Sequence, residues 1–205
     1  MTPDFQSAAS PVVLDIIGLA KRASDGSTGP VEAERAALRA SFETAAAICR
    51  GPAAEDWRLA SYALASAVDE LLIVDITWPG QAWWENHAME VELFGTRKRA
   101  TEFFTLSEKA ASLPRGDALQ VFVAAVIMGF QGTYRERPDS LETWLRMNRQ
   151  RIKLSTDRPS VPSSGPEVAG AGPLTGNVLL LWSVFSSLLF AAIFIVTTWS
   201  VFYLL

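Results

Sequence analysis

The chain has 205 residues, with 18 Lys and Arg, 22 Asp and Glu, one His, one Cys and a formal net charge of −4. Residues 1–145 carry 13 basic and 20 acidic side chains, and this acidic balance argues against nucleic acid as the main partner. The single cysteine, Cys49, excludes an intramolecular disulfide and suits a reducing compartment.

Apolar residues at helical spacing predict seven helices in the first three quarters of the chain. Their expected ranges are 10–24, 30–50, 53–76, 81–94, 100–112, 118–130 and 140–154. Pro11 and Pro30 are expected at helix starts, where proline is favoured, and Asp117 is expected to cap the sixth helix. The alternating apolar and polar runs that are typical of strands are absent from the sequence. The sequence therefore predicts an all-α domain.

Two of the expected helices are apolar on nearly every side. The first contains the run Leu59–Val68, and the second is Ala118–Phe130. A helix that is apolar all round is buried all round. Because there are two such helices, we expect two small helical bundles side by side.

The last 28 residues, Val178–Leu205, contain no charged residue, His, Pro or Gly. A membrane-spanning helix needs roughly 20 apolar residues. At 1.5 Å per residue, Trp182 would lie about 25–32 Å from Trp199 and Tyr203, which is the spacing of the two interfacial aromatic belts. We therefore expect residues 177–205 to form one C-terminal transmembrane helix, which makes the protein tail-anchored.

Residues 155–176 are rich in Pro, Gly and Ser and are predicted to be a linker, which leaves 1–154 as the helical domain. Between residues 146 and 167, just before the anchor, five basic residues face two acidic ones. Positive charge marks the cytoplasmic end of a membrane helix, so the helical domain is expected in the cytoplasm. This basic collar is also expected to touch anionic headgroups of the lipid bilayer.

Small residues recur every four positions in the expected anchor, at Ser183, Ser187 and Ala191. Such a stripe lets two membrane helices approach closely. The pattern predicts self-association of the anchor, and hence a homodimer or higher oligomer.

Asp69 and Glu70 interrupt the apolar run of the third expected helix. A buried carboxylate is costly unless it is well hydrogen-bonded, so one interpretation is that at least one of them accepts hydrogen bonds from a neighbouring helix end or from Arg135. The other is that they line a cleft that takes a basic partner segment. Glu70 lies about 40° from polar Ser66 around the helix, so we expect Glu70 to contact a partner and Asp69 to be structural.

An enzymatic function finds little support in the residues. His87 and Glu90 have the spacing of a metal-binding pair, but a di-iron or zinc site needs more His or Cys ligands than the chain contains. Walker A, Rossmann and nucleophile-elbow motifs are absent from the sequence. We therefore expect no catalytic residues, no metal and no cofactor, with His87 on a solvated face.

Four stretches, taken in order, resemble the TssL/DotU (IcmH-like) family of inner-membrane secretion proteins. They are Ala60–Glu70, Thr77-Trp78 with Gly80, Phe103-Phe104, and Gly129–Arg135. Their order and spacing match the family over about residues 55–153, and the expected C-terminal anchor matches as well.

This resemblance implies an all-helical, hook-like cytoplasmic domain of two bundles and no catalysis. It implies a structural subunit of a type VI secretion system, a single-pass protein of the bacterial inner membrane with its C-terminus on the periplasmic side. Implied partners are a TssM/IcmF-like protein in a TssJ-containing membrane complex, and baseplate proteins such as TssK.

Two alternatives stay open at this stage. The same family includes stabilising subunits of type IVB secretion systems of the DotU type. An apolar central helix followed by a C-terminal anchor is also found in groove-type binding adaptors of the Bcl-2 type, where a long apolar groove would be exposed.

Overall fold

The structure is a computed structural model that describes residues 1–156. Eight α-helices make up this part: α1 (Pro3–Asp25), α2 (Val31–Ile48), α3 (Ala54–Glu70), α4 (Gln81–Asn86), α5 (Met89–Phe94), α6 (Arg99–Ser112), α7 (Asp117–Ile127) and α8 (Pro138–Thr156). Two 3₁₀ turns, η1 (Gly51–Ala53) and η3 (Gly132–Tyr134), and the π-helical turn η2 (Leu71–Asp75) complete it. The all-α expectation is confirmed for these residues.

The predicted anchor at residues 177–205, with its stripe of Ser183, Ser187 and Ala191, lies outside the described residues, as does nearly all of the predicted linker. Within residues 1–156, no helix combines the length and the apolar character that crossing a membrane requires.

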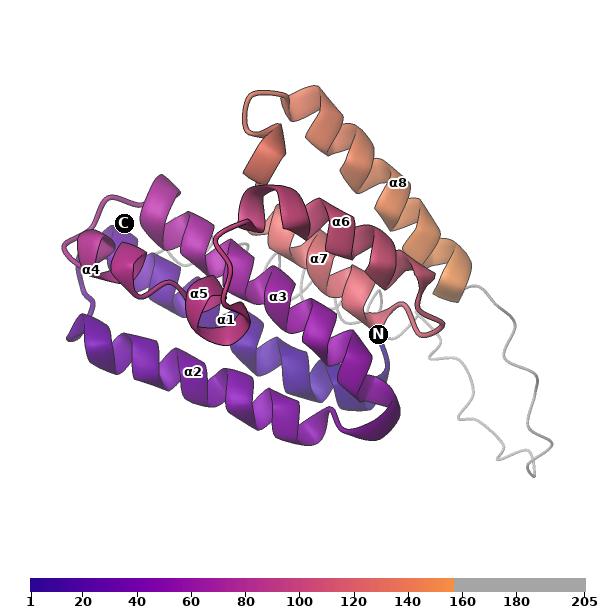
Figure 1. The fold of residues 1–205 in the computed structure, drawn as a ribbon, viewed down its shortest axis with the longest axis horizontal. Coiled ribbons are helices and arrows are strands. Elements are labelled where there is room, and N and C mark those ends of the chain that lie inside the picture. Colours follow the sequence, from indigo (N-terminus) through magenta and orange to yellow (C-terminus); the bar gives the residue numbers. More distant parts are fainter. Residues whose placement is uncertain (157–205) are drawn as a thin grey trace, which may run out of the picture. The chain divides into compact units, whose positions relative to one another are not determined.

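Helix α3 is the centre of the fold (Figure 1). It packs against α1, α2, α5, α6 and α7, and every side chain from Leu59 to Glu70 is buried. Its most extensive neighbour is α7, which is buried along most of its length. Both helices that the sequence predicts to be buried are therefore in the core, and a single cluster of buried apolar residues joins them.

Helices α3 and α7 lie side by side and run in the same direction. Near their starts, the backbone N–H of Ala118 donates to Asp56 at 3.2 Å. At their other ends, the N–H of Gln131, just past α7, donates to Glu70, the last residue of α3, at 2.8 Å. Helix α2 packs on α1, and α6 and α8 pack on α7, each joined to its neighbour by a short connection (Figure 1). This arrangement brings the C-terminal end of α3 to the loop that follows α7.

Helix α1 starts earlier than expected. It begins at Pro3 instead of residue 10, so Pro11 lies inside the helix. The apolar face continues upstream through Phe5 and Ala8, both buried in the core, and their burial stabilises the additional turns. Pro11 removes the backbone bond to Ser7, but both residues are exposed, where water can solvate the free carbonyl.

The helix expected over residues 81–94 is two helices, with a break at His87 and Ala88 between α4 and α5. The helix expected over 53–76 continues past α3 as η2, in which the N–H of Ile76 donates to the carbonyl of Leu71, five residues back. Neither feature has a proline or glycine at the point of change, so tertiary contacts decide both.

Candidate functional site

Asp69, on the last turn of α3, is completely buried. Its Oδ1 accepts hydrogen bonds from the indole N–H of Trp84 at 2.9 Å and from the backbone N–H of Met89 at 2.8 Å. Its Oδ2 accepts from the backbone N–H of Glu90 at 2.8 Å. Met89 and Glu90 open α5, so Asp69 satisfies the N–H groups that a helix start leaves without a partner.

Burial raises the pKa of Asp69 above the ordinary value for an aspartate, while its three hydrogen bonds act in the opposite direction. The same three bonds explain the break between α4 and α5. Two free N–H groups at a new helix start can meet the carboxylate, whereas in a continuous helix those N–H groups would be bonded within the helix. Asp69 therefore fixes where α5 begins.

Glu70, the next residue, is 4% exposed and points to the loop after α7. Its Oε1 accepts the backbone N–H groups of Gln131 at 2.8 Å and Gly132 at 2.9 Å. The guanidinium of Arg135 donates to the same oxygen at 2.8 Å. Glu70 thus joins the end of α3 to the turn η3.

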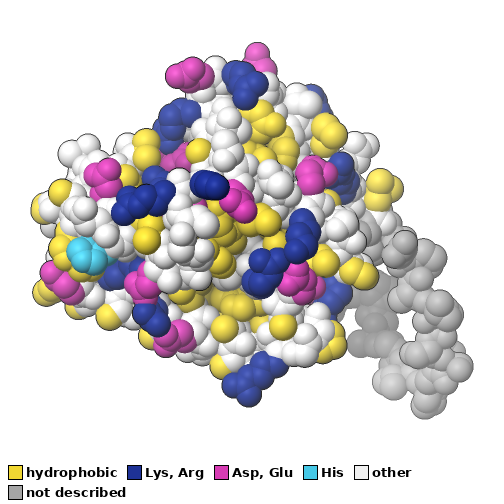
Figure 2. All heavy atoms as spheres, viewed as in Figure 1, with side chains coloured by type: hydrophobic (Ala, Val, Ile, Leu, Met, Phe, Trp, Pro, Cys, Tyr) yellow, Lys and Arg dark blue, Asp and Glu magenta, His cyan; other side chains and the backbone are white. Residues whose placement is uncertain are grey.

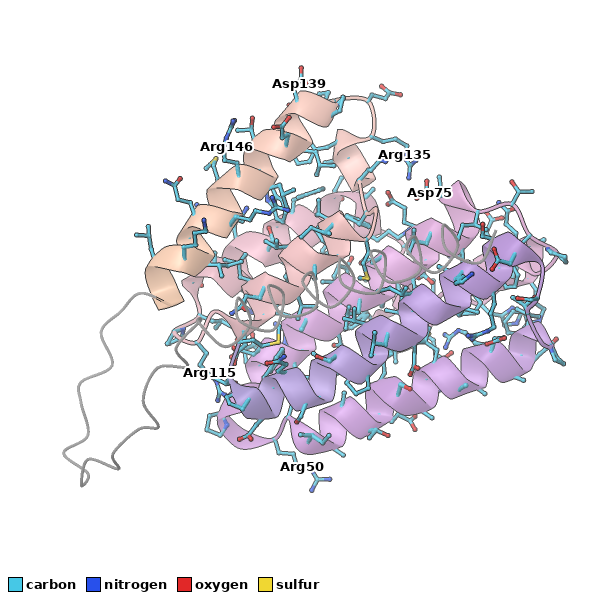
Figure 3. The ribbon with its side chains drawn as sticks, turned by 180° about the vertical axis from the view of Figure 1, so that it is seen from behind. Arg50, Asp75, Arg115, Arg135, Asp139 and Arg146 are labelled. Atoms are coloured by element: carbon cyan, nitrogen blue, oxygen red, sulfur yellow. The ribbon has the colours of Figure 1, made fainter. Side chains whose placement is uncertain are left out.

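The surface of this site consists of Arg135 and Asp75. Arg135 is 38% exposed, and its second guanidinium nitrogen donates to Asp75 at 2.8 Å (Figure 3). The two carboxylates beside it raise the pKa of Arg135, Asp75 more strongly than Glu70. The site therefore presents an ion pair to solvent, with Glu70 underneath holding the guanidinium in place.

Both carboxylates that the sequence singled out accept hydrogen bonds from neighbouring helix starts, and Arg135 is a donor to Glu70, as one interpretation expected. Their side chains point to different elements, Asp69 to α5 and Glu70 to η3. Partner contact by either residue stays a prediction, and the groups that reach the surface beside them are Arg135 and Asp75.

Glycine is required in the turn that Glu70 holds. Gly132 has φ of 49°, and a Cβ there would lie 2.8 Å from the backbone carbonyl of Ala100 and 2.9 Å from the ring of Phe130. The absence of a side chain at Gly132 therefore lets this turn pack closely against the first turn of α6.

Three further buried carboxylates act in the same way, and sequence analysis did not identify this role. Asp117, expected to cap its own helix, instead accepts the N–H and the hydroxyl of Thr2, both at 2.7 Å, at the start of α1. Asp56 accepts the N–H of Ala118 in α7, and Glu90 accepts the N–H of Lys98 before α6 at 2.7 Å.

These carboxylates replace local capping. In α1 to α7, no N-cap residue bonds the first turn through its own side chain. The starts of α1, α5, α6 and α7 are each bonded by a carboxylate from elsewhere in the sequence. In the sequence, the signal for such a capping carboxylate is an acidic residue among apolar residues. This signal does not show which other helix the carboxylate will cap.

His87 lies on a solvated face, as the sequence predicts, and two tryptophans of the same region lie in the core. His87, the cyan side chain in Figure 2, is exposed and stacks on Trp83 with ring centroids 4.0 Å apart. Trp78 and Trp84 are buried. Glu90 is bonded elsewhere in the core, and no cluster of His, Cys, Asp or Glu within residues 1–156 has an arrangement that could hold a metal.

Comparison with known families decides what this fold belongs to. A family model described as type VI secretion system protein DotU matches residues 5–204, nearly the whole chain. The chain belongs to the DotU family. The match includes the apolar C-terminal segment as well as the helical domain, so both parts are features of a DotU-family chain.

The fold of this DotU-family chain is similar to that of the cytoplasmic domain of TssL from Acinetobacter baumannii, with a TM-score of 0.62. The sequences are 22% identical, and the likeness covers 72% of this chain and 98% of the other. At this identity the comparison establishes the all-helical fold. No curated protein matches the chain.

Proposed function

We propose that this chain is a structural, non-catalytic subunit of a type VI secretion membrane complex in the bacterial inner membrane. The observation that carries the proposal is the DotU match, which spans the helical domain and the apolar segment together. In this proposal residues 177–205 cross the membrane once, residues 155–176 link the two parts, and residues 1–154 lie in the cytoplasm.

The geometry of the buried polar groups supports a mechanical role. Within residues 1–156, all five buried carboxylates accept backbone N–H groups at helix or turn starts, so they link the helices together. Such links give a rigid helical domain, which suits a subunit that transmits position between a membrane and a cytoplasmic assembly.

We propose partners on each side of the membrane. A TssM/IcmF-like protein and its TssJ-containing complex would meet the anchor, and a baseplate protein such as TssK would meet the helical domain. The contact nearest the predicted site would be made by the exposed pair Arg135 and Asp75, with Glu70 positioning Arg135. Chains would pair in the membrane through Ser183, Ser187 and Ala191.

A groove-type adaptor is less consistent with the observed packing. In such an adaptor the apolar central helix would line an exposed groove. Here that helix, α3, is covered by five neighbouring helices. A type IVB assembly of the DotU kind would share this fold, and its subunits would differ from those of type VI.

Co-purification tests the proposal. The tagged full chain is solubilised from its bacterial membranes in mild detergent, and the co-purifying proteins are identified by mass spectrometry. We expect a TssM-like protein and a baseplate subunit. Arg135→Ala should reduce recovery of the baseplate subunit and leave the TssM-like protein unchanged, because the substitution removes a cytoplasmic contact only.

Arg137→Ala is the matched control, since Arg137 is an exposed arginine of the same loop that makes no ion pair within residues 1–156. Thermal unfolding of each variant separates lost contact from lost fold. Recovery of no secretion subunit with the unsubstituted chain would contradict the proposed function. Equal recovery with both variants would contradict the role of Arg135.

A further inference from the structure

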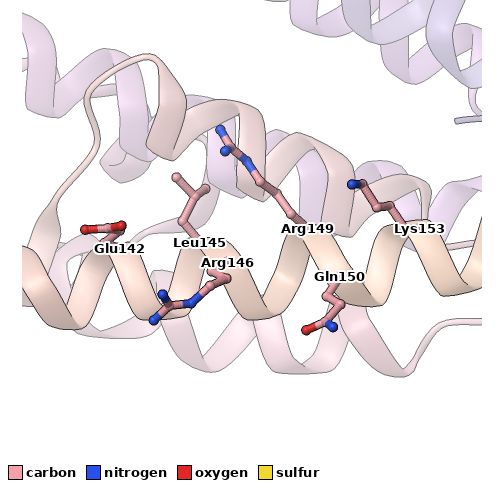
Figure 4. A pocket seen from close by; sticks show the side chains of 6 residues that line it. All are labelled: Glu142, Leu145, Arg146, Arg149, Gln150 and Lys153. Carbon is pink, nitrogen blue, oxygen red and sulfur yellow. The ribbon is translucent and has the colours of Figure 1, made fainter.

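Helix α8 carries a row of polar and basic side chains on the face turned away from the core. Arg146, Arg149, Gln150 and Lys153 are all exposed on this face. In Figure 4, Arg149 and Lys153 point to one side of the helix, and Arg146 and Gln150 point to the other. The opposite face carries Trp144, which is buried against the rings of α6. One helix therefore separates an apolar inner face from a basic outer face.

The basic residues of this outer face have no acidic partner within residues 1–156. Arg149 and Lys153 make no ion pair there, and the bond of Arg146 is to the hydroxyl of Thr143 at 3.3 Å. Arg151, at the edge of the inner face, is different, because it pairs with Glu108 of α6 at 2.9 Å. The exposed carboxylate of Glu142 lies on the same face and offsets part of this charge. Between residues 142 and 153 the outer face of α8 thus carries three basic side chains against one acidic side chain, and it stays net positive.

Two exposed apolar side chains flank this positive surface on the same side. Met147 is 50% exposed and Leu154 is 70% exposed, and they lie seven residues apart, almost in line along the helix. A helix that presents basic side chains next to exposed apolar ones suits the interface of an anionic membrane. There the cations meet lipid phosphates and the apolar groups enter the acyl boundary.

The position of α8 in the chain favours lipid as the occupant. It is the last helix described, and about 20 residues separate its end from the apolar segment that starts at Val178. A coil of that length spans about 25 Å on average, so an anchored chain keeps the end of α8 within reach of the bilayer surface. An acidic protein would match the charge, but nothing in the chain would hold it next to α8.

We propose that the outer face of α8, made by Arg146, Arg149, Gln150 and Lys153 with Met147 and Leu154, docks on the anionic lipid headgroups of the membrane that holds the anchor. This inference rests on the proposed membrane attachment. Docking fixes the orientation of the helical domain, because α8 packs on α7 through its other face. The linker alone would leave that orientation free.

The full chain in lipid nanodiscs, one copy per disc, provides the test. Cys49→Ala removes the native thiol, and Gln150→Cys places a fluorescent label at the centre of the outer face, where the native side chain is exposed and uncharged. Ala46→Cys, exposed on α2, is the matched control label. Quenching by aqueous iodide is measured in discs of phosphatidylcholine, with and without phosphatidylglycerol.

We expect the label at position 150 to be protected only in discs that contain phosphatidylglycerol, and to become accessible at high salt. Arg149→Gln with Lys153→Gln should lower the ratio of docked to free domain about 25-fold, or about fivefold for each side chain. The label at position 46 should stay accessible throughout. Equal accessibility of position 150 in both kinds of disc would overturn the proposal.

Other outcomes are also decisive. Protection at position 150 that is the same with both lipids would overturn an electrostatic contact with headgroups. Protection only in discs that carry two copies would replace lipid by a second chain as the occupant. A chain that does not co-elute with discs would refute the membrane attachment and, with it, the docking. A chain that co-elutes with an accessible label refutes the docking alone.

Discussion

The carboxylate of Asp69 accepts the backbone N–H of Glu90 at 2.8 Å, so the last turn of α3 caps the first turn of α5. The carboxylate of Glu90 in turn accepts the N–H of Lys98 at 2.7 Å, just before α6 begins. The carboxylate of Asp69 therefore connects α3 to α5, and the carboxylate of Glu90 connects α5 to the start of α6. Loss of the first contact should weaken the placement of both later helices.

The first prediction concerns stability. We expect residues 1–156 to fold alone as a helical domain with a cooperative melt. Asp69→Asn should lower the free energy of unfolding by about 1–3 kcal/mol. The substitution replaces one carboxylate oxygen by an NH₂ group, which cannot accept the N–H groups that donate to Asp69. Glu70→Gln should cost less, since its amide oxygen can still accept from Gln131 and Gly132. Urea unfolding followed by circular dichroism measures both.

Asp25→Asn is the control for this series, because Asp25 is an exposed partner of Lys21 and its loss should stay within about 0.5 kcal/mol. A fragment without a cooperative transition would contradict the assignment of a self-contained helical domain. Equal losses for Asp69→Asn and Asp25→Asn would show that the buried carboxylate is not needed as an acceptor.

The second prediction separates steric contact from backbone strain. Gly132→Ala and Gly26→Ala both place a side chain at positive φ, 49° and 68°. A Cβ at position 26 meets no atom within 4 Å, so this substitution should cost about 1 kcal/mol, the strain alone. The Cβ at position 132 also strikes the carbonyl of Ala100, so Gly132→Ala should cost about 1–3 kcal/mol more. Equal losses in the same unfolding assay would refute the close contact.

The third prediction concerns acid stability. Hydrogen bonds from Arg58 and Lys109 lower the pKa of Glu55 from 4.5 to about 2. A depressed pKa means that the folded state binds the proton less readily than the unfolded state. The stabilisation is therefore complete above pH 4.5 and is lost as the pH falls toward 2.

Glu55→Gln should accordingly show a shallower loss of stability below pH 4.5 than the unsubstituted domain. Glu43→Gln, which removes an exposed glutamate of α2 paired with Arg39, is the matched control and should retain the steep loss. Because the Glu55 pairs are half-exposed, 1 M salt should reduce the difference. Urea unfolding between pH 6 and pH 3 measures these slopes, and parallel slopes for both variants would exclude a role for Glu55.

The fourth prediction concerns the anchor. Ser187→Ile places a large side chain on the proposed small-residue stripe and should weaken self-association in a membrane two-hybrid assay. Ser186→Ile changes the neighbouring serine, which lies off the stripe, and should have little effect. Equal self-association of the Ser187→Ile and Ser186→Ile variants would show that the anchors do not contact one another through the small-residue stripe.

The sequence by itself determined the helical class and the two central helices, because their apolar residues cover every side of each helix. It also determined the family, whose motifs keep their order from Ala60 to Arg135. Within those motifs it pointed to Asp69 and Glu70, since two adjacent charges in an apolar run need a specific reason to be there.

Only the tertiary structure decided which groups those charges meet. Asp69 accepts the N–H groups at the start of α5 and so interrupts the helix expected over residues 81–94. Asp117 bonds Thr2, near the start of the chain, instead of the first turn of its own helix. The physical reason is that a helix start offers free N–H groups to any carboxylate nearby in space. An apolar run around a carboxylate predicts that the carboxylate is buried. The packing of α1, α3 and α7 decides which N–H groups donate to it.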